Sequence, residues 1–280
     1  MSAAISARAA AADATRRAGE TRSLAASRSI DRRSGGRSGG GGGTTLYSAN
    51  EIDVEFAWFA PQSEYRPTEY LQAWVQFWFD EAKRLSAAKS FQHARLEFIA
   101  QHWLNNRPLA DHGFVLPSDN LHSVLAASRQ RIATAPDHTA LLTEEARLTK
   151  HLYKLAVEAV GYGEFSRAKR ATGTDPANRF LDHGNYLAYG LGATAAWVLG
   201  LPHGLAILHG KTRRGGLVFD IADLVKDALV LPQAFISAMR GDDEQTFRQA
   251  CIDRFSQAEA LDLMIDTTKA VALTMGKAEA

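Results

Sequence analysis

The sequence has one cysteine, Cys251, among its 280 residues. A single thiol cannot form an internal disulfide, and it excludes a cysteine-based zinc site. No stretch approaches the roughly 20 unbroken apolar residues of a membrane-spanning helix or contains the apolar core of a secretory signal. We therefore expect neither a membrane-spanning helix nor a secretory signal. The formal net charge is only +1, so the chain as a whole is not a simple polycation for nucleic acid.

Residues 1–43 lack lysine and aromatic side chains, and Ala, Arg, Ser and Gly make up 34 of the 43 positions. Eight arginines against three acids give this segment a net charge of +5. So few large apolar residues cannot offset the entropy lost on ordering, and we predict a disordered tail. The composition fits an organelle transit peptide, a basic arm that contacts phosphates, a solvated low-complexity tail, or a start that is not the natural one.

Residues 44–280 carry a net charge of −4 and show apolar residues mainly at helical spacing. We predict a mainly α fold in which one helical domain, residues 44–280, follows the tail. The expected helices lie near residues 67–79, 90–104, 119–133, 139–160, 175–199, 217–229, 231–240 and 244–275. Gly184, inside one of these patterns, predicts a close approach between two helices.

The segment after Pro67 carries an aromatic stripe at helical spacing, made of Leu71, Trp74, Val75, Trp78 and Phe79. Such a stripe on an amphipathic helix is usually part of the hydrophobic core. A platform on which nucleic-acid bases stack is the alternative.

The 139–160 segment contains two neighbouring glutamates that the helical period places on different faces. Glu145 lies on an apolar stripe with Leu148, Leu152 and Leu155, so we predict that it points inward. Glu144 lies on a polar stripe and is expected to face solvent. A carboxylate on a buried face needs an ion-pair partner, a proton or a metal ion. The choice between a salt bridge and a metal or catalytic role stays open.

A second polar cluster begins at His209, which ends a short apolar run and precedes a glycine-flanked basic loop. Lys211, Arg213 and Arg214 in this loop have the chemistry of phosphate contacts. The order of glycine and lysine differs from that of a Walker phosphate-binding loop.

Three aspartates share a face of the following helix: Asp220, Asp223 and Asp227, with Lys226 one turn from Asp223. A solvated acidic face is one interpretation. The other is a hard-metal site, because histidine nitrogen and carboxylate oxygen without thiolate favour Mg²⁺ or Mn²⁺ over zinc.

Several ordered motifs resemble the CRISPR adaptation integrase, the metal-dependent DNA endonuclease that inserts new spacers into CRISPR arrays. They are Glu145-Ala-Arg-Leu-Thr-Lys-His-Leu-Tyr153, Asp175-Pro-Ala-Asn178, Gly200-Leu-Pro-His-Gly-Leu-Ala-Ile-Leu-His209 and Phe219-Asp-Ile-Ala-Asp223. The phrases His183-Gly-Asn-Tyr-Leu-Ala-Tyr-Gly190 and His209-Gly-Lys-Thr-Arg-Arg-Gly-Gly216 resemble its type I-F branch, as do Asn50–Phe56 and Pro61–Tyr70. The likeness covers roughly residues 41–275.

The resemblance implies a role for each matching residue. Glu145, His209 and Asp223 match the family's metal ligands, Asp220 a supporting acidic position and Lys226 a basic position beside the site. The implied cofactor is Mg²⁺ or Mn²⁺. The implied reaction is attack by the 3′-hydroxyl of a DNA fragment on a phosphodiester of the CRISPR repeat. Lys211, Arg213 and Arg214 would hold flanking phosphates.

The resemblance also implies a cytoplasmic protein with prespacer and repeat DNA as substrates. Its protein partner would be a small ferredoxin-like subunit, fused to a helicase-nuclease in the type I-F branch. Family members form a homodimer with the help of an N-terminal β-rich domain, and no such pattern precedes Leu46. We therefore hypothesise a truncated or frameshifted start. Two alternatives are a non-catalytic fragment that binds DNA or a partner, and an unrelated helical protein with buried salt bridges at Glu145 and Asp223.

Overall fold

In the computed structural model, the described residues are 44–47, 55–59, 67–104, 107–116, 118–168, 175–210 and 214–277. The predicted tail, residues 1–43, lies outside them. The chain divides into two compact units, residues 1–65 and 66–280. In the first unit, β1 (Thr44–Tyr47) pairs with β2 (Glu55–Phe59) in antiparallel orientation, with Thr44 opposite Phe59. Neither strand was predicted, because neither segment alternates apolar and polar side chains.

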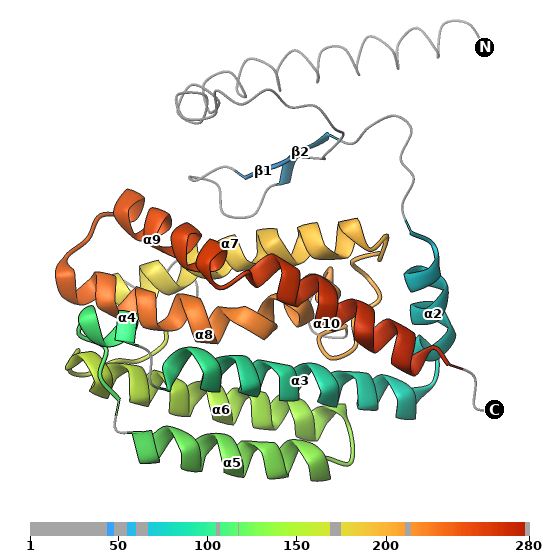
Figure 1. The fold of residues 1–280 in the computed structure, drawn as a ribbon, viewed down its shortest axis with the longest axis horizontal. Helices are drawn as coiled ribbons and strands as arrows, with labels where there is room; N and C mark the ends of the chain where they lie inside the picture. The colour runs from blue at the N-terminus through green and yellow to red at the C-terminus, as the bar shows by residue number, and fades with distance from the viewer. Residues whose placement is uncertain are drawn as a thin grey trace, which may run out of the picture. The chain divides into compact units, whose positions relative to one another are not determined.

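The second unit is helical in its described residues, which confirms the mainly α fold (Figure 1). Its helices are α2 (Glu69–Trp78), α3 (Glu81–Trp103), α4 (Arg107–Asp111), α5 (Ser118–Thr134), α6 (His138–Val160), α7 (Pro176–Val198), α8 (Gly216–Arg240), α9 (Glu244–Gln257) and α10 (Ala260–Met275). Over the described residues, no helix is both long and apolar enough to cross a membrane.

Helix α8 lies at the centre of this unit and packs against α3, α6, α7, α9 and α10 (Figure 1). Nearly all of its residues from Gly216 to Ser237 are buried, as expected of a helix enclosed by others. The prediction of separate helices at 217–229 and 231–240 was wrong, because α8 continues through Pro232. Proline lacks the N–H that would bond the carbonyl of Ala228, and Trp103 Nε1 donates to that oxygen at 3.1 Å instead.

Two other helix boundaries differ from the prediction. Helix α3 begins at Glu81, nine residues before the expected start, because the Asp80 carboxylate caps it by accepting from the backbone N–H of Ala82 and Lys83. The predicted 244–275 helix is interrupted at Ala258 and Glu259, and Glu259 has a φ of 49°.

The aromatic stripe of α2 is only partly buried. Trp74 is fully enclosed, which places it in the core, whereas Phe79 is 77% exposed and Val75 lies near the surface. The buried face instead includes Tyr70 and Phe77. Tyr70, Trp74 and Phe77 follow the helical repeat, so the buried face is rotated away from Val75 and Phe79.

Close packing of α7 against α8 occurs at two glycines. A Cβ atom at Gly192 would lie 2.7 Å from the carbonyl oxygen of Val218, and one at Gly184 would lie 2.3 Å from a methyl group of Val230. The close approach predicted from Gly184 is confirmed. These contacts bring α7 against α8 near both Val218 and Val230.

Candidate metal centre

Helix α6 presents Glu145 at one wall of the site. The helix begins after the N-cap Asp137, whose side chain accepts from Ala140 N at 2.8 Å, and ends at Gly161 with a φ of 67°. The Glu145 side chain is 13% exposed, in agreement with its predicted inward direction. Glu144 was predicted to face solvent, and this was wrong. It is 3% exposed because Arg131 and Arg147 each donate to its Oε2 at 2.7 Å and cover it.

The loop before α8 carries His209 and is held by two tryptophans of α2. Trp74 Nε1 donates to Leu205 O at 2.9 Å, and Trp78 Nε1 donates to Ala206 O at 2.7 Å. Gly216 permits the return of the chain, since a Cβ there would lie 2.9 Å from the backbone of His209. The indole groups therefore do more than fill the core, because they fix the loop that places the histidine.

Asp220 on α8 organises the backbone around His209. One carboxylate oxygen accepts from the backbone N–H of Ile207 and Leu208 at 2.8 and 3.2 Å. The other accepts from His209 N at 3.1 Å and lies 2.7 Å from His209 Nδ1. A proton on Nδ1 directed at Asp220 leaves Nε2 as the atom that faces the site. Metal-ligating histidines are commonly oriented by a carboxylate in this way.

The three residues predicted as metal ligands converge. One ligand atom from each of Glu145, His209 and Asp223 lies within 4.8 Å of the other two. His209 Nε2 is 3.2 Å from Glu145 Oε2. Lys226 forms an ion pair with Asp223, so the basic position also lies beside the cluster. The alternative of an unrelated helical protein would have been favoured by wide separation of these three residues, and their convergence argues against it.

The charges of the cluster are strongly coupled. Burial lowers the pKa of His209, but its contacts with Asp220 and Glu145 outweigh burial and raise that pKa to about 10. Burial raises the pKa of Asp223 to about 6, against the attraction of Lys226. For Glu145, burial opposes ionisation, yet the His209 contact and the charge of Arg95 bring its pKa well below the ordinary value. The cluster therefore favours a proton on His209 between the carboxylates of Asp220 and Glu145.

The donor set fits a divalent cation. Asp223 is 3% exposed, and its Oδ2 atom is buried without a hydrogen-bond partner among the described residues. Lys226 pairs with Oδ1 only. A buried carboxylate oxygen without a partner is unfavourable unless a cation or a donor compensates it. Two carboxylates and one imidazole nitrogen would suit Mg²⁺ or Mn²⁺.

Arg95 and Asp227 form a buried ion pair next to the cluster that sequence reasoning missed. Arg95 on α3 is 1% exposed and donates to Asp227, to Gln92 Oε1 at 3.0 Å and to Thr149 Oγ1 at 2.9 Å. Its Nη1 atom lies 4.0 Å from Glu145 Oε1. The salt-bridge interpretation of Glu145 was therefore partly right, because Arg95 lies within ion-pair distance of Glu145 but donates its hydrogen bonds to Asp227 and not to Glu145. Arg95 offers no sequence signal, because an arginine in an amphipathic helix normally faces solvent.

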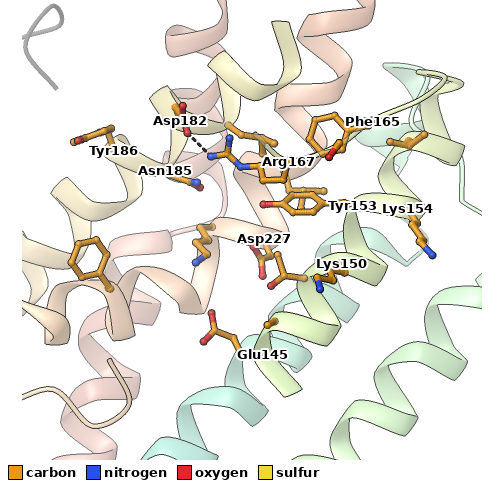
Figure 2. A pocket seen from close by; sticks show the side chains of 18 of the residues that line it. Glu145, Lys150, Tyr153, Lys154, Phe165, Arg167, Asp182, Asn185, Tyr186 and Asp227 are labelled. Atoms are coloured by element: carbon orange, nitrogen blue, oxygen red, sulfur yellow. Dashed lines mark hydrogen bonds and ion pairs between the residues drawn. The ribbon is translucent and has the colours of Figure 1, made fainter. Parts of the chain in front are cut away.

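A cavity of about 1110 Å³ opens beside Glu145, Lys226 and Asp227. Figure 2 shows Glu145 and Asp227 toward one end and the ion pair of Arg167 with Asp182 toward the other. The rest of its lining is rich in basic and aromatic side chains, among them Lys150, Tyr153, Lys154, Tyr186 and Tyr189. Sequence reasoning missed these residues, although Thr149 and Tyr153 follow Glu145 at the four-residue spacing of one helix face.

The predicted DNA-contacting loop is described only at its end. Arg214 is exposed and lines the same cavity. Lys211 and Arg213 lie outside the described residues. The phosphate-binding role of all three stays a prediction.

Comparison with known proteins decides the family. The family model described as CRISPR associated protein Cas1 matches residues 44–247. The chain belongs to the Cas1 family. It is 68% identical over 230 residues to the CRISPR-associated endonuclease Cas1 of Pseudomonas aeruginosa, covering 82% of this chain and 71% of that protein. It is 60% identical, with the same coverage, to the Cas1 endonuclease of Pectobacterium atrosepticum. These relatives support the type I-F branch.

Solved structures agree with this fold. A Cas1 protein from Thermotoga maritima superposes with a TM-score of 0.58 at 16% identity, covering 78% of this chain and 76% of that chain. A casposase bound to its integration product gives a TM-score of 0.59 at 15% identity, covering 80% of this chain and 69% of that chain. At these identities the likeness establishes the fold alone.

Proposed function

We propose that this Cas1 family member is a divalent-metal-dependent DNA endonuclease and integrase that acts in CRISPR spacer acquisition. The observation that carries the proposal is the convergence of Glu145, His209 and Asp223, whose ligand atoms lie within 4.8 Å of one another. The endonuclease names of two relatives at 60% identity or more support the reaction class.

The proposed reaction is a transesterification. The 3′-hydroxyl of a captured DNA fragment loses its proton as its oxygen bonds to a phosphorus of the repeat. The bridging P–O bond of that phosphodiester breaks, and the displaced oxygen of the repeat strand takes up a proton and leaves as a new hydroxyl. Glu145, His209 and Asp223 would hold a divalent ion, which when bound would neutralise charge at the phosphate oxygens and lower the pKa of the attacking hydroxyl. With water as the nucleophile, the same site would act as a nuclease.

The residues around the ligands have separate tasks in this proposal. Asp220 orients His209 through Nδ1, so that Nε2 faces the ligand cluster. Lys226, which pairs with Asp223 in this structure, would move its ammonium toward a substrate phosphate when Asp223 binds the cation. Arg95 keeps the Asp227 carboxylate neutralised beneath the site.

The cavity beside the cluster suits a DNA strand. Lys150, Lys154 and Arg214 supply positive charge along its lining, and tyrosines offer surfaces for base stacking. We extend the proposal to Lys211 and Arg213 as further phosphate contacts. The proposed partners are prespacer and repeat DNA, the small adaptation subunit fused to a helicase-nuclease, and a second copy of this chain.

The test is metal-dependent cleavage of branched DNA and strand transfer into a repeat-containing duplex by the purified protein. We expect activity with Mg²⁺ or Mn²⁺, and none with EDTA. The His209→Ala variant should lose more than about 100-fold in rate, beyond the loss typical of residues that only support a metal ligand.

The matched control is His122→Ala, which removes an exposed histidine of α5. It should retain wild-type activity. Equal cleavage by His209→Ala and the wild type, or cleavage that survives EDTA, would contradict the proposed site.

A further inference from the structure

A second cavity, of about 370 Å³, lies between α3, α4, α8 and α9 and is here called the α9 cavity. It shares no lining residue with the larger cavity and contains no residue of the metal-ligand cluster. Its polar lining consists of His102, His112, Gln233, Asp253, Arg254 and Gln257. The Cas1 reaction as proposed above makes no use of it.

Arg254 is the unusual residue of the α9 cavity. Its side chain is largely buried, and its Nε atom has no hydrogen-bond partner. No carboxylate in the described part of the chain forms an ion pair with it, unlike the fully buried Arg95, which pairs with Asp227. Burial lowers the pKa of Arg254, with only the Cys251 thiol opposing this effect. A guanidinium stays protonated in proteins, so it cannot escape burial by losing its proton.

The surroundings of Arg254 do not supply the missing negative charge. Asp253 is the one carboxylate among the described residues that line the cavity, and its Oδ1 accepts from Gln249 Nε2 at 2.8 Å. His112 lies 2.8 Å from Arg240, which adds positive charge near the rim. Gln233 donates to Ser237 Oγ at 3.0 Å and is held in place by that bond. The lining therefore combines Arg254, which has no ion-pair partner among the described residues, with one carboxylate, Asp253, that does not pair with it, and with neutral polar groups.

Size and chemistry together select the ligand class. A volume of about 370 Å³ is at the small end of ligand cavities, which span roughly 300–1,000 Å³, and it is too small for a duplex or a helix. A planar guanidinium matches carboxylate and phosphate groups through paired N–H···O bonds. We propose that the α9 cavity is a binding site for a small oxyanion, a carboxylate or phosphate group that pairs with Arg254.

The experiment uses the full chain after treatment with chelating resin, because EDTA itself carries carboxylates. Inorganic phosphate and sodium acetate are titrated separately at constant ionic strength, with chloride as the reference salt. Binding is followed by calorimetry and by the midpoint of thermal unfolding. Arg254→Gln removes the charge, and Arg248→Gln is the matched control, since Arg248 lies on the same helix and does not line the cavity.

We expect phosphate, acetate or both to raise the unfolding midpoint of the wild type and of Arg248→Gln above its value in chloride. Phosphate alone would identify a phosphate site, and acetate alone a carboxylate site. In Arg254→Gln the affinity should fall at least about tenfold, the effect of losing one charge-assisted contact. In chloride this variant should unfold no earlier than the wild type, because it removes a partly buried charge that has no carboxylate partner among the described residues.

Two results would overturn the proposal. One is a wild type that responds to neither anion. The other is an equal response in Arg254→Gln, which would move binding to basic residues elsewhere, such as Lys150 or Arg214 in the larger cavity. If Arg254→Gln fails to fold, Arg254→Lys keeps the charge but loses the paired geometry, and undiminished affinity in that variant would contradict the assigned contact.

Discussion

His209 is held between two carboxylates, and its protonation links the metal site to pH. In the metal-free protein the contacts with Asp220 and Glu145 raise its pKa to about 10. Protonated His209 therefore stabilises the fold fully below the ordinary histidine pKa, and this contribution is lost as the pH rises through about 10. A metal ion on Nε2 must displace the same proton.

We predict that Mn²⁺ affinity rises with pH. Asp223 has a pKa of about 6 and Glu145 a lowered one, so above about pH 6 the His209 proton is the one that must leave. The dissociation constant should fall about tenfold per pH unit from about pH 6.5 to about pH 8.5, with one proton released per ion bound. Calorimetry in buffers of different ionisation enthalpy measures both quantities.

The control for this measurement is His122→Ala, which should show the same pH profile as the wild type because His122 is exposed on α5. An affinity that does not change over this range, with no proton release, would show that the ion does not bind at Nε2 of His209.

At the scale of secondary structure, the contact between α7 and α8 sets the position of the ligand-bearing turn of α8. Gly192 faces Val218 and Ala222, one residue before Asp223. Backbone lies opposite this glycine, so the neighbours cannot move aside as a flexible side chain would. Asp220 and Asp223 extend from the same part of α8, and their position depends on this close approach.

We predict that Gly192→Ala destabilises the protein by about 1–3 kcal/mol, the typical effect of overpacking a close contact. Alanine is more favourable than glycine inside a helix by up to about 1 kcal/mol. Helix propensity alone would therefore raise the free energy of unfolding, whereas crowding would lower it. Urea unfolding of the variant and the wild type measures this change in the free energy of unfolding. Gly204→Ala is the control, since a Cβ there meets no atom within 4 Å. Increased stability of Gly192→Ala would contradict the inferred packing.

At the scale of the whole helical unit, three separate parts of the chain supply the proposed ligands. Glu145 comes from α6, His209 from the loop before α8, and Asp223 from α8 itself. An ion bound to all three joins segments that are 64 and 14 residues apart in sequence. Such an ion binds the folded state and not the unfolded chain, so it must stabilise the fold.

We predict that Mn²⁺ at about one hundred times its dissociation constant raises the free energy of unfolding by about 2.7 kcal/mol. Urea unfolding with Mn²⁺ and with EDTA gives this difference. His209→Ala should lose most of the gain, whereas His122→Ala should keep it. The same gain in His209→Ala would place the stabilising ion elsewhere.

The sequence pattern correctly predicted features that depend on residues close together in the chain. The 139–160 periodicity predicted α6 and the inward direction of Glu145, and Asp175-Pro176 and Gly161 marked helix ends that the structure confirms. The family followed from ordered motifs. Local pattern failed for Glu144, because two arginines bury a carboxylate on a polar face, and for Pro232, because Trp103 from another helix satisfies the carbonyl that proline leaves unbonded.

The sequence by itself determined the helical class, the family and the residue types that could hold a cation, since helical periodicity and ordered motifs are properties of the chain alone. Only the tertiary structure decided that Glu145, His209 and Asp223 meet, that Arg95 pairs with Asp227 and that the Nε atom of Arg254 is buried without a partner among the described residues. The physical reason is that ligand convergence and the electrostatics of burial depend on groups far apart in sequence, which only the packing of α3, α6, α8 and α9 brings within reach.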